Sequence, residues 1–297
     1  MIDTILTPWQ HGFMQHAFMA IIMVGVICGI TGVFVTLRGM AFLGDALSHA
    51  IFPGVVIAFI TGGNFLVGAL IAAFIVSLGI GAVTQNGRIS NDTAIGVFFV
   101  GAFALGVALL SLQKSYVRDL NAFLLGSILG VTPSDLRLIA IVGALVLGII
   151  FWFRRELTMV SFDRTFAKAS GLNLWFYDQL FLIVLAFTIV ISLQTVGNIL
   201  VLAMLVTPAA TARLLTDRML PMLALSACIG AGSGIVGLYL SYYQGIPSGS
   251  GVVLVATGVF FVAYLFAPRT GIVTSRIAYR RHRAHPEHDA DFLASGD

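Results

Sequence analysis

The segment Gly44-Asp45-Ala46-Leu47-Ser48-His49 places a carboxylate and an imidazole four residues apart inside an apolar stretch, roughly residues 42 to 61. On a helix this spacing puts both side chains on one face, with their Cβ atoms about 5–6 Å apart. A carboxylate oxygen and an imidazole nitrogen so placed can share one divalent cation. Asp45 is also the only carboxylate well inside any apolar stretch of the chain. The pair is therefore the first candidate for a metal site.

The same two residues admit other interpretations. Asp45 and His49 can pair with each other as a satisfied polar spot between packed helices, or they can relay protons. A charge at bilayer depth costs at least ~2.5–3.5 kcal/mol, so such residues usually face a pathway or a partner. Spacing alone leaves these alternatives open. Pro53 removes a backbone donor and predicts a kink about one turn further along the helix.

The composition indicates a membrane protein. Of the 297 residues, 59% are hydrophobic and only 10% are charged, whereas soluble domains average about 25% charged residues. Uncharged apolar stretches long enough to span a bilayer recur from end to end. The net charge of +3 does not indicate a nucleic-acid partner, because the basic residues lie in loops and in the tail. The expected partner of the apolar surface is the lipid bilayer.

We expect an all-α polytopic membrane protein with about eight to ten transmembrane or re-entrant helical segments. The run at 120–132 covers only about 20 Å as a helix, which favours a re-entrant or interfacial segment. The run at 198–212 is also short for a full crossing. The longer expected spans are residues 13–37, 42–61, 65–84, 93–112, 133–153, 179–197, 219–244 and 250–267.

The division of the chain follows from these spans. Residues 1–12 form an N-terminal segment, 13–267 the transmembrane domain, and 268–297 a basic tail that we expect to be disordered. The distribution of Lys and Arg places the tail and the charged segment 154–178 in the cytoplasm. Nine crossings put the N-terminus outside and ten put it inside. Both arrangements leave most basic residues inside, so charge does not choose between them.

Two smaller features have competing interpretations. Asp163 to Gly171 reads as a short amphipathic helix ended by Gly171, although spacing alone fits an ordinary cytoplasmic loop equally well. In the tail, His282, His285 and His288 have a spacing that can bind metal. A solvated tail fits them better, because Pro286 interrupts any helix there.

The chain lacks the sequence motifs of several enzyme classes. No Gly-Lys dipeptide occurs, so the phosphate-binding P-loop is absent and we expect no nucleotide hydrolysis by that route. The H-E-x-x-H pattern of zinc proteases is absent too. An intramembrane aspartyl protease needs two carboxylates in the membrane, and only Asp45 qualifies. We therefore expect a protein that is not itself an enzyme.

Four blocks of sequence follow one another over essentially the whole membrane part. The first is Gly44-Asp45-Ala46-Leu47-Ser48-His49-Ala50 with Pro53-Gly54, and the second runs from Asp119 to Asp135. The others are Val206-Thr207-Pro208-Ala209-Ala210-Thr211-Ala212-Arg213 and Pro247-Ser248-Gly249. Together these blocks resemble the membrane permeases of bacterial ABC transporters that import manganese, zinc or iron, and it is their combination that is specific.

The resemblance implies an ATP-driven importer in which this chain is the permease. It implies a second permease copy in a homodimer, a separate ABC ATPase in two copies, and a metal-delivering binding protein outside. It implies a transient metal site on Asp45 and His49 and no permanently bound cofactor. The segment Asp163 to Gly171 matches the family's cytoplasmic coupling helix, which rests in a groove of the ATPase; the residues implied there are Asp163, Phe166, Ala167, Ala169 and Gly171.

The ligand types bear on the metal. Nitrogen and oxygen ligands without a thiolate suit Mn²⁺, Zn²⁺ or Fe²⁺ and argue against Cu(I). Manganese is slightly favoured and zinc is the next choice. A transport site should be incomplete, because the ion must also leave it. The alternative function is a self-contained secondary carrier in which Asp45 and His49 relay protons.

Overall fold

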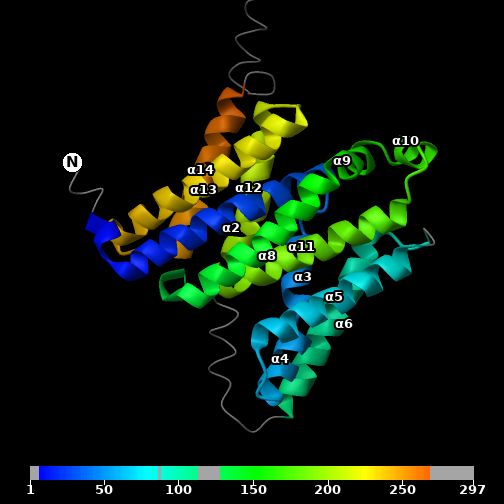
Figure 1. Ribbon diagram of the computed structural model, residues 1–297, viewed down its shortest axis with the longest axis horizontal. Helices are drawn as coiled ribbons and strands as arrows, with labels where there is room; N and C mark the ends of the chain where they lie inside the picture. Colours follow the sequence, from blue (N-terminus) through cyan, green and yellow to red (C-terminus); the bar gives the residue numbers. More distant parts are fainter. Residues whose placement is uncertain (1–6, 86–87, 113–127, 268–297) are drawn as a thin grey trace, which may run out of the picture.

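The computed structural model describes residues 7–85, 88–112 and 128–267. The described chain is helical throughout, with no strand in these ranges (Figure 1). Its elements in chain order are η1 (Thr7–Gln10), α2 (Gly12–Leu37), α3 (Leu43–Ala50), α4 (Phe52–Ile60), α5 (Phe65–Thr84), α6 (Asn91–Ser111), η2 (Ile128–Gly130), α8 (Pro133–Trp152), α9 (Arg154–Phe162), α10 (Arg164–Ala169), α11 (Leu174–Val196), α12 (Asn198–Leu215), α13 (Met219–Gln244) and α14 (Ser248–Phe266).

The polytopic membrane fold is confirmed. Within the described ranges, nine helical segments are long and apolar enough to cross a membrane, with α3 and α4 counted together as Leu43–Ile60. The doubtful run at 198–212 is one of them, as α12. Of the other doubtful run, residues 120–127 lie outside the described residues, as does the tail at 268–297. Residues 128–130 form the single turn η2.

The ends of several helices follow from local side-chain chemistry. The Asn64 side chain accepts a hydrogen bond from Leu66 N at 2.9 Å and so begins α5. Thr132 and Asp135 form a reciprocal capping box at the start of α8, where a proline occupies the first turn. Gly245, with φ +68°, ends α13 in the left-handed conformation. These caps explain why the observed bounds lie close to the predicted spans.

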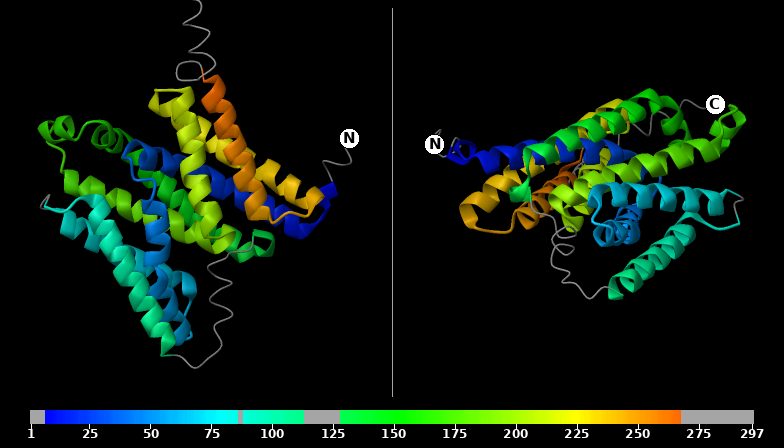
Figure 2. Two further views of the ribbon diagram at one scale, coloured as in Figure 1. Left: turned by 180° about the vertical axis from the view of Figure 1, so that it is seen from behind. Right: turned by 60° about the horizontal axis from the view of Figure 1, so that its bottom comes forward.

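Two helices form the centre of the bundle. In α2 and α11, 78% of the residues in the most apolar 18-residue part of the helix are buried within the chain. The corresponding share is 17% in α6 and 22% in α8 and α14. Figures 1 and 2 show α2 running between α8 and α13, and it packs against α11, α12, α13 and α8. The outer helices turn apolar side chains away from the bundle, as a lipid-facing or subunit-facing surface requires.

Small residues let α2 and α13 approach until their backbones touch. A Cβ atom added to Gly230 would lie 2.6 Å from the carbonyl oxygen of Gly25, and one added to Gly29 would lie 2.7 Å from that of Ser226. The Ser226 hydroxyl donates to the Gly29 carbonyl at 2.7 Å. Close packing through glycine and serine is how helices associate in lipid, where the hydrophobic effect does not drive them together.

The two ends of α2 define the two ends of the bundle. At the Trp9 end, the Trp9 indole donates to the Tyr239 hydroxyl at 2.7 Å and so joins η1 to α13. At the Arg38 end, the Arg213 guanidinium donates to Thr36 O at 3.2 Å and brings in the last turn of α12. Helix α11 runs from the Arg38 end to the turn at Gly197 and α12 returns from it, and α13 and α14 then run to the Trp9 end and back. Helices α9 and α10 and the end of α14 therefore all lie at the Arg38 end (Figure 1).

The corner between α11 and α12 lies deep inside the bundle. Antiparallel contacts between α2 and α11 pair Cys28 with Ser192 and Thr31 with Thr188, each at 3.3 Å between the side-chain sulfur or oxygen atoms. Extending this register places the end of α11 beside Val24, roughly halfway along α2. Gly197, with φ +81°, then turns the chain directly into α12. The shortness of the 198–212 run follows from this, because α12 begins at mid-depth.

The predicted kink near Pro53 is present as a break. Helix α3 ends at Ala50 and α4 begins at Phe52, with Ile51 between them and Pro53 in the first turn of α4. Proline fits the first turn because its missing N–H has no intrahelical acceptor there. The break separates the segment that carries Asp45 and His49 from the more apolar α4.

The glycine contact between α2 and α13 gives a test of the fold. Gly230→Ala should destabilise the protein by about 1–3 kcal/mol, because its Cβ meets backbone that cannot move aside. Gly232→Ala, two residues along the same helix and facing open space, should instead raise stability by about 0.5–1 kcal/mol through helix propensity. Thermal unfolding in detergent measures both changes. A Gly230→Ala protein as stable as Gly232→Ala would contradict the packing described.

Candidate functional site

Asp45 and His49 lie on α3 as the sequence predicts. The imidazole Nε2 of His49 and the carboxylate Oδ1 of Asp45 are 3.7 Å apart, which is longer than a hydrogen bond between them. Their side chains are 35% and 45% exposed, respectively. The pair therefore faces a space in the single chain and is not closed on itself.

A third polar side chain completes the cluster. Asn198, the first residue of α12, lies with its amide Nδ2 3.4 Å from Asp45 Oδ1 and 3.3 Å from His49 Nε2. Because the chain turns at Gly197, the Asn198 amide lies roughly halfway along the bundle. Asp45, His49 and Asn198 are named here the polar cluster. Its position beside the corner of α11 and α12 places it roughly halfway along α2.

The surroundings of the polar cluster fix its orientation. The His49 ring lies 5.7 Å from the ring of Phe99 and 5.6 Å from that of Phe103, measured between centroids, so α6 forms one wall. The buried Ser48 hydroxyl donates to the Asp45 carbonyl at 2.7 Å and so satisfies itself within α3. The aromatic wall limits the directions from which a ligand can reach the imidazole.

Two pockets approach the polar cluster from opposite ends of the bundle. One, of about 510 Å³, is lined by η2, by the Val196–Leu200 corner that includes Asn198, and by the turn between α13 and α14. The other, of about 380 Å³, is lined by Asp45, by residues of the Gly39–Ala46 stretch and by the first turns of α6. Asn198 thus faces the Trp9 end and Asp45 the Arg38 end. The polar cluster lies between the two pockets.

The polar cluster is a partial ligand set. Among the described residues, no group of three or more His, Cys, Asp or Glu side chains comes together. One carboxylate, one imidazole and one amide supply oxygen and nitrogen atoms of the kind that bind divalent transition metals. They fall short of the six to eight oxygens of a calcium site or the four protein ligands of a structural zinc site. The arrangement can bind a cation that keeps some of its water.

The predicted helix at Asp163 to Gly171 is present as α10. The Asp163 carboxylate caps it by accepting from Thr165 N at 2.8 Å and Phe166 N at 2.9 Å. Gly171 ends it with φ +81°. Ala167 is buried against the bundle while Phe166 is 58% exposed. The sequence did not indicate α9, which precedes α10, so the charged segment 154–178 contains two short helices where one was expected.

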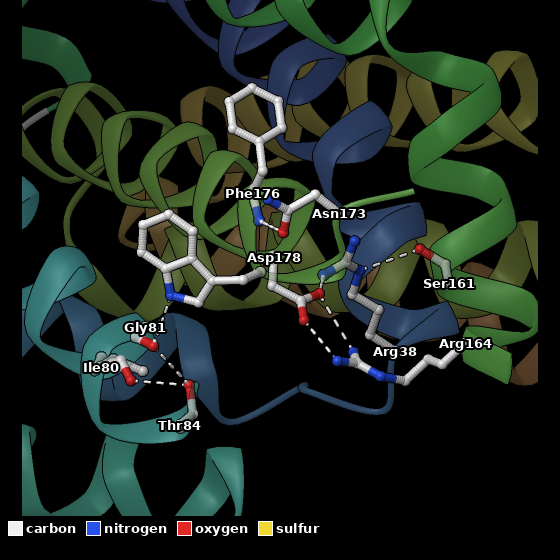
Figure 3. Close-up of polar contacts among 10 residues, drawn as sticks. Arg38, Ile80, Gly81, Thr84, Ser161, Arg164, Asn173, Phe176 and Asp178 are labelled. Atoms are coloured by element: carbon white, nitrogen blue, oxygen red, sulfur yellow. Dashed lines mark hydrogen bonds and ion pairs between the residues drawn. The ribbon is translucent and has the colours of Figure 1, made fainter. Parts of the chain in front are cut away.

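An ion-pair network joins this segment to the membrane helices (Figure 3). Asp178, near the start of α11, accepts from Arg38 Nη1 at 2.8 Å and from Arg164 Nη2 at 2.6 Å. The Arg38 side chain is only 4% exposed, its Nε donates to Ser161 of α9 at 3.1 Å, and its guanidinium carbon lies 4.3 Å from the ring centroid of Phe181. Burial lowers the pKa of Arg38 to about 10, against the opposing attraction of Asp178, so Arg38 remains a cation at neutral pH.

Sequence reasoning missed three of these residues. Asn198 is a polar residue at the edge of an apolar run, directly after a glycine, and that position was the available signal. Arg38 reads as a turn residue and Asp178 as one of many loop charges. Their pairing joins positions 140 apart in the chain, and no local pattern reveals such a contact.

Comparison with known proteins gives consistent matches over nearly the whole chain. Residues 10–267 match the ABC 3 transport family. The manganese transport system membrane protein MntC of Listeria innocua is 46% identical over 267 residues, which cover 90% of this chain and 95% of that protein. The probable iron transport system membrane protein of Haemophilus influenzae is 37% identical over 274 residues, which cover 92% of this chain and 97% of that protein.

A solved structure matches at the level of the whole fold. A chain of PsaBC from Streptococcus pneumoniae, in complex with Fab, superposes with a TM-score of 0.79 at 38% sequence identity. The match covers 91% of this chain and 98% of that chain. The overall arrangement of helices is therefore shared with a solved protein.

The ion-pair network predicts unequal effects on stability. Asp178→Asn should cost about 3–5 kcal/mol, because it leaves the buried Arg38 without its counter-charge. Arg164→Ala removes a half-exposed partner of the same carboxylate and should cost no more than about 1 kcal/mol. Thermal unfolding of the two variants in detergent compares them. Equal losses would show that Arg38 does not depend on Asp178.

Proposed function

This chain belongs to the ABC 3 transport family and is a metal permease subunit, and from that premise we propose that it imports manganese(II) in an ATP-driven transporter. The ion passes a transient site formed by Asp45 and His49. Hydrolysis of ATP takes place in a separate subunit, because the sequence has no P-loop of its own. The protein is a multi-pass membrane protein, and we place it in the bacterial cytoplasmic membrane.

One observation carries this proposal: the polar cluster lies at mid-depth between two pockets that open towards opposite ends. Asn198 lines the pocket of the Trp9 end, and Asp45 lines the pocket of the Arg38 end. A carboxylate at such depth is costly unless it serves a pathway. An ion arriving from one pocket meets all three side chains before it reaches the other.

The ligand set suits a site that binds and then releases. Asp45 supplies a carboxylate oxygen and His49 an imidazole nitrogen. Turning the Asn198 amide by 180° presents its carbonyl oxygen to the same space, so that residue can serve either as a donor to Asp45 or as a third ligand. The remaining positions are left to water, to backbone or to another subunit. Incomplete ligation favours release.

Manganese is the metal we propose first. The relative from Listeria innocua is a manganese transport protein at 46% identity, while that from Haemophilus influenzae is a probable iron transport protein at 37%. The oxygen and nitrogen ligands also accept zinc, which binds such sites more tightly than manganese in general. Selectivity for manganese would then rest with the protein that delivers the ion.

We assign the Arg38 end to the cytoplasm. The charged segment 154–178 and the end of α14 both lie at this end of the bundle, and basic residues favour the cytoplasmic side. The C-terminus is then cytoplasmic and the Trp9 end faces outward. Helix η1, at the Trp9 end, then lies on the outer side.

The ATPase is proposed to bind at α10, in two copies for a pair of permeases. Phe166 is exposed there, on a helix capped by Asp163 and ended by Gly171, while the buried Ala167 keeps the helix close to its surroundings and Ala169 is exposed beside Phe166 on the partner-facing side. An apolar side chain that projects from a capped helix end suits a groove in a partner. A metal-delivering protein would bind at the opposite end, above the pocket that Asn198 lines.

A second copy of this chain is proposed to close the site. Asp45 is 45% exposed in a single chain, although it lies at mid-depth beside α6, of which only 17% is buried. Contact of that carboxylate with lipid would be costly. A second permease packed against this face in a homodimer would enclose it.

Uptake into vesicles tests the proposal. Vesicles that hold this chain, its ATPase and its binding protein should accumulate Mn²⁺ only when ATP is supplied. Asp45→Asn and His49→Gln should each reduce uptake at least about tenfold, since each removes a metal ligand. Asn198→Ala should retain partial uptake because both stronger ligands remain.

His16→Gln is the matched control for His49→Gln, because His16 lies on α2 in the membrane part but away from the polar cluster. It should transport like the native protein. If Asp45→Asn and His49→Gln transport normally in assembled complexes, the site assignment is wrong. If Mn²⁺ enters with this chain alone and without ATP, the protein is a self-contained carrier.

A further inference from the structure

Helix α10 is joined to the membrane helix α11 by a bidentate ion pair. Of its six residues only Ala167 is buried. The Arg164 guanidinium reaches back from α10 to α11 and donates to both oxygens of Asp178, at 2.6 and 3.3 Å (Figure 3). A two-bond contact of this kind fixes direction as well as distance. Movement of α10 therefore acts directly on Asp178.

The same carboxylate holds the buried Arg38. Asp178 Oδ1 accepts from Arg38 Nη1 at 2.8 Å as well as from Arg164. Arg38 also contacts Ser161 of α9 and the ring of Phe181 of α11. Two arginines from different parts of the chain thus share one counter-charge at the Arg38 end.

Arg38 connects in turn to the helix of the polar cluster. It caps the end of α2, and the turn that follows is held by hydrogen bonds from Met40 N to Val35 O and from Leu43 N to Met40 O, each 3.0 Å. Helix α3 starts at Leu43, and Asp45 lies in its first turn. Because these bonds tie Met40 to the last turn of α2 and Leu43 to Met40, a displacement of the α2 end at Arg38 acts on the start of α3.

The shared carboxylate allows two discrete arrangements. Among the described residues, Arg38 Nη2 is buried without a hydrogen-bond partner. If Arg164 withdraws, Asp178 Oδ2 becomes free and Arg38 can take both carboxylate oxygens with both of its terminal nitrogens. Coupling between sites needs an element with two such arrangements, each favoured under different conditions.

We propose that Arg164, Asp178 and Arg38 are positioning residues that transmit movement of α10 to Asp45 and His49. The proposal rests on the function proposed above, in which the ATPase binds α10. When the ATPase draws α10 away, Arg164 releases Asp178, Arg38 takes the whole carboxylate, and the start of α3 shifts. Exchange of partners at Asp178 is the switching step.

The number of Mn²⁺ ions moved per ATP hydrolysed tests this link in the reconstituted transporter. Arg164→Ala should lower that ratio at least about fivefold, the lower range of typical coupling between sites, while ATP hydrolysis continues. Arg164→Lys keeps the charge but not the two-bond geometry and should fall between Arg164→Ala and the native ratio. Arg155→Ala, which removes an exposed arginine of α9 at the same end, should leave the ratio unchanged.

A purely structural role would lower assembly or stability but leave the ratio of ions to ATP intact. A native ratio in Arg164→Ala therefore overturns the proposal; if that variant does not assemble with the ATPase, a native ratio in Arg164→Lys does so. Native complexes that hydrolyse ATP but move no Mn²⁺ would instead refute the proposed function itself. The two failures are thus distinguished within one experiment.

Discussion

A carboxylate roughly halfway along the central helix α2 of a membrane protein is the constraint on which the rest of this structure depends. Contact between the Asp45 carboxylate and lipid would cost free energy. In the fold, the carboxylate instead lies beside the His49 imidazole of its own helix and the Asn198 amide of α12. The amide arrives only because α11 ends at mid-depth and Gly197 turns the chain within the bundle. The corner at Gly197, the short α12 and the polar cluster are therefore linked, because the position of the corner sets where α12 begins and so places Asn198 beside Asp45.

The helices around this cluster are held by contacts that suit lipid better than water. Backbone contact between α2 and α13 through Gly25 and Gly230 sets a rigid centre, and the break at Ile51 leaves α3 as a short segment between that centre and α6. A short segment can shift without disturbing the long helices. The ion pair of Arg38 with Asp178 lies near the start of α3, and Arg164 of α10 contacts the same carboxylate there.

Much of the fold and part of the site could be predicted from the sequence, for identifiable reasons. Long uncharged stretches predict membrane helices, because the backbone must satisfy its hydrogen bonds internally in lipid. The four-residue spacing of Asp45 and His49 predicts that both side chains lie on the same face of one helix. Asp163 and Gly171 predict the ends of α10 because capping is local. Asn198 and the pairing of Arg38 with Asp178 could not be predicted, because both depend on the register between helices far apart in the chain. That register is set by packing, as in the contact of Cys28 with Ser192, and it leaves no local pattern.

The central claim is that Mn²⁺ binds to the imidazole of His49 at mid-membrane depth. Pulsed electron paramagnetic resonance of Mn²⁺ bound to the purified permease and ATPase complex tests it most directly, because a coordinated imidazole nitrogen couples to the electron spin. The native protein and His16→Gln should show this nitrogen coupling, and His49→Gln should lose it. Nitrogen coupling that persists unchanged in His49→Gln would contradict the account, whatever the variant does to transport.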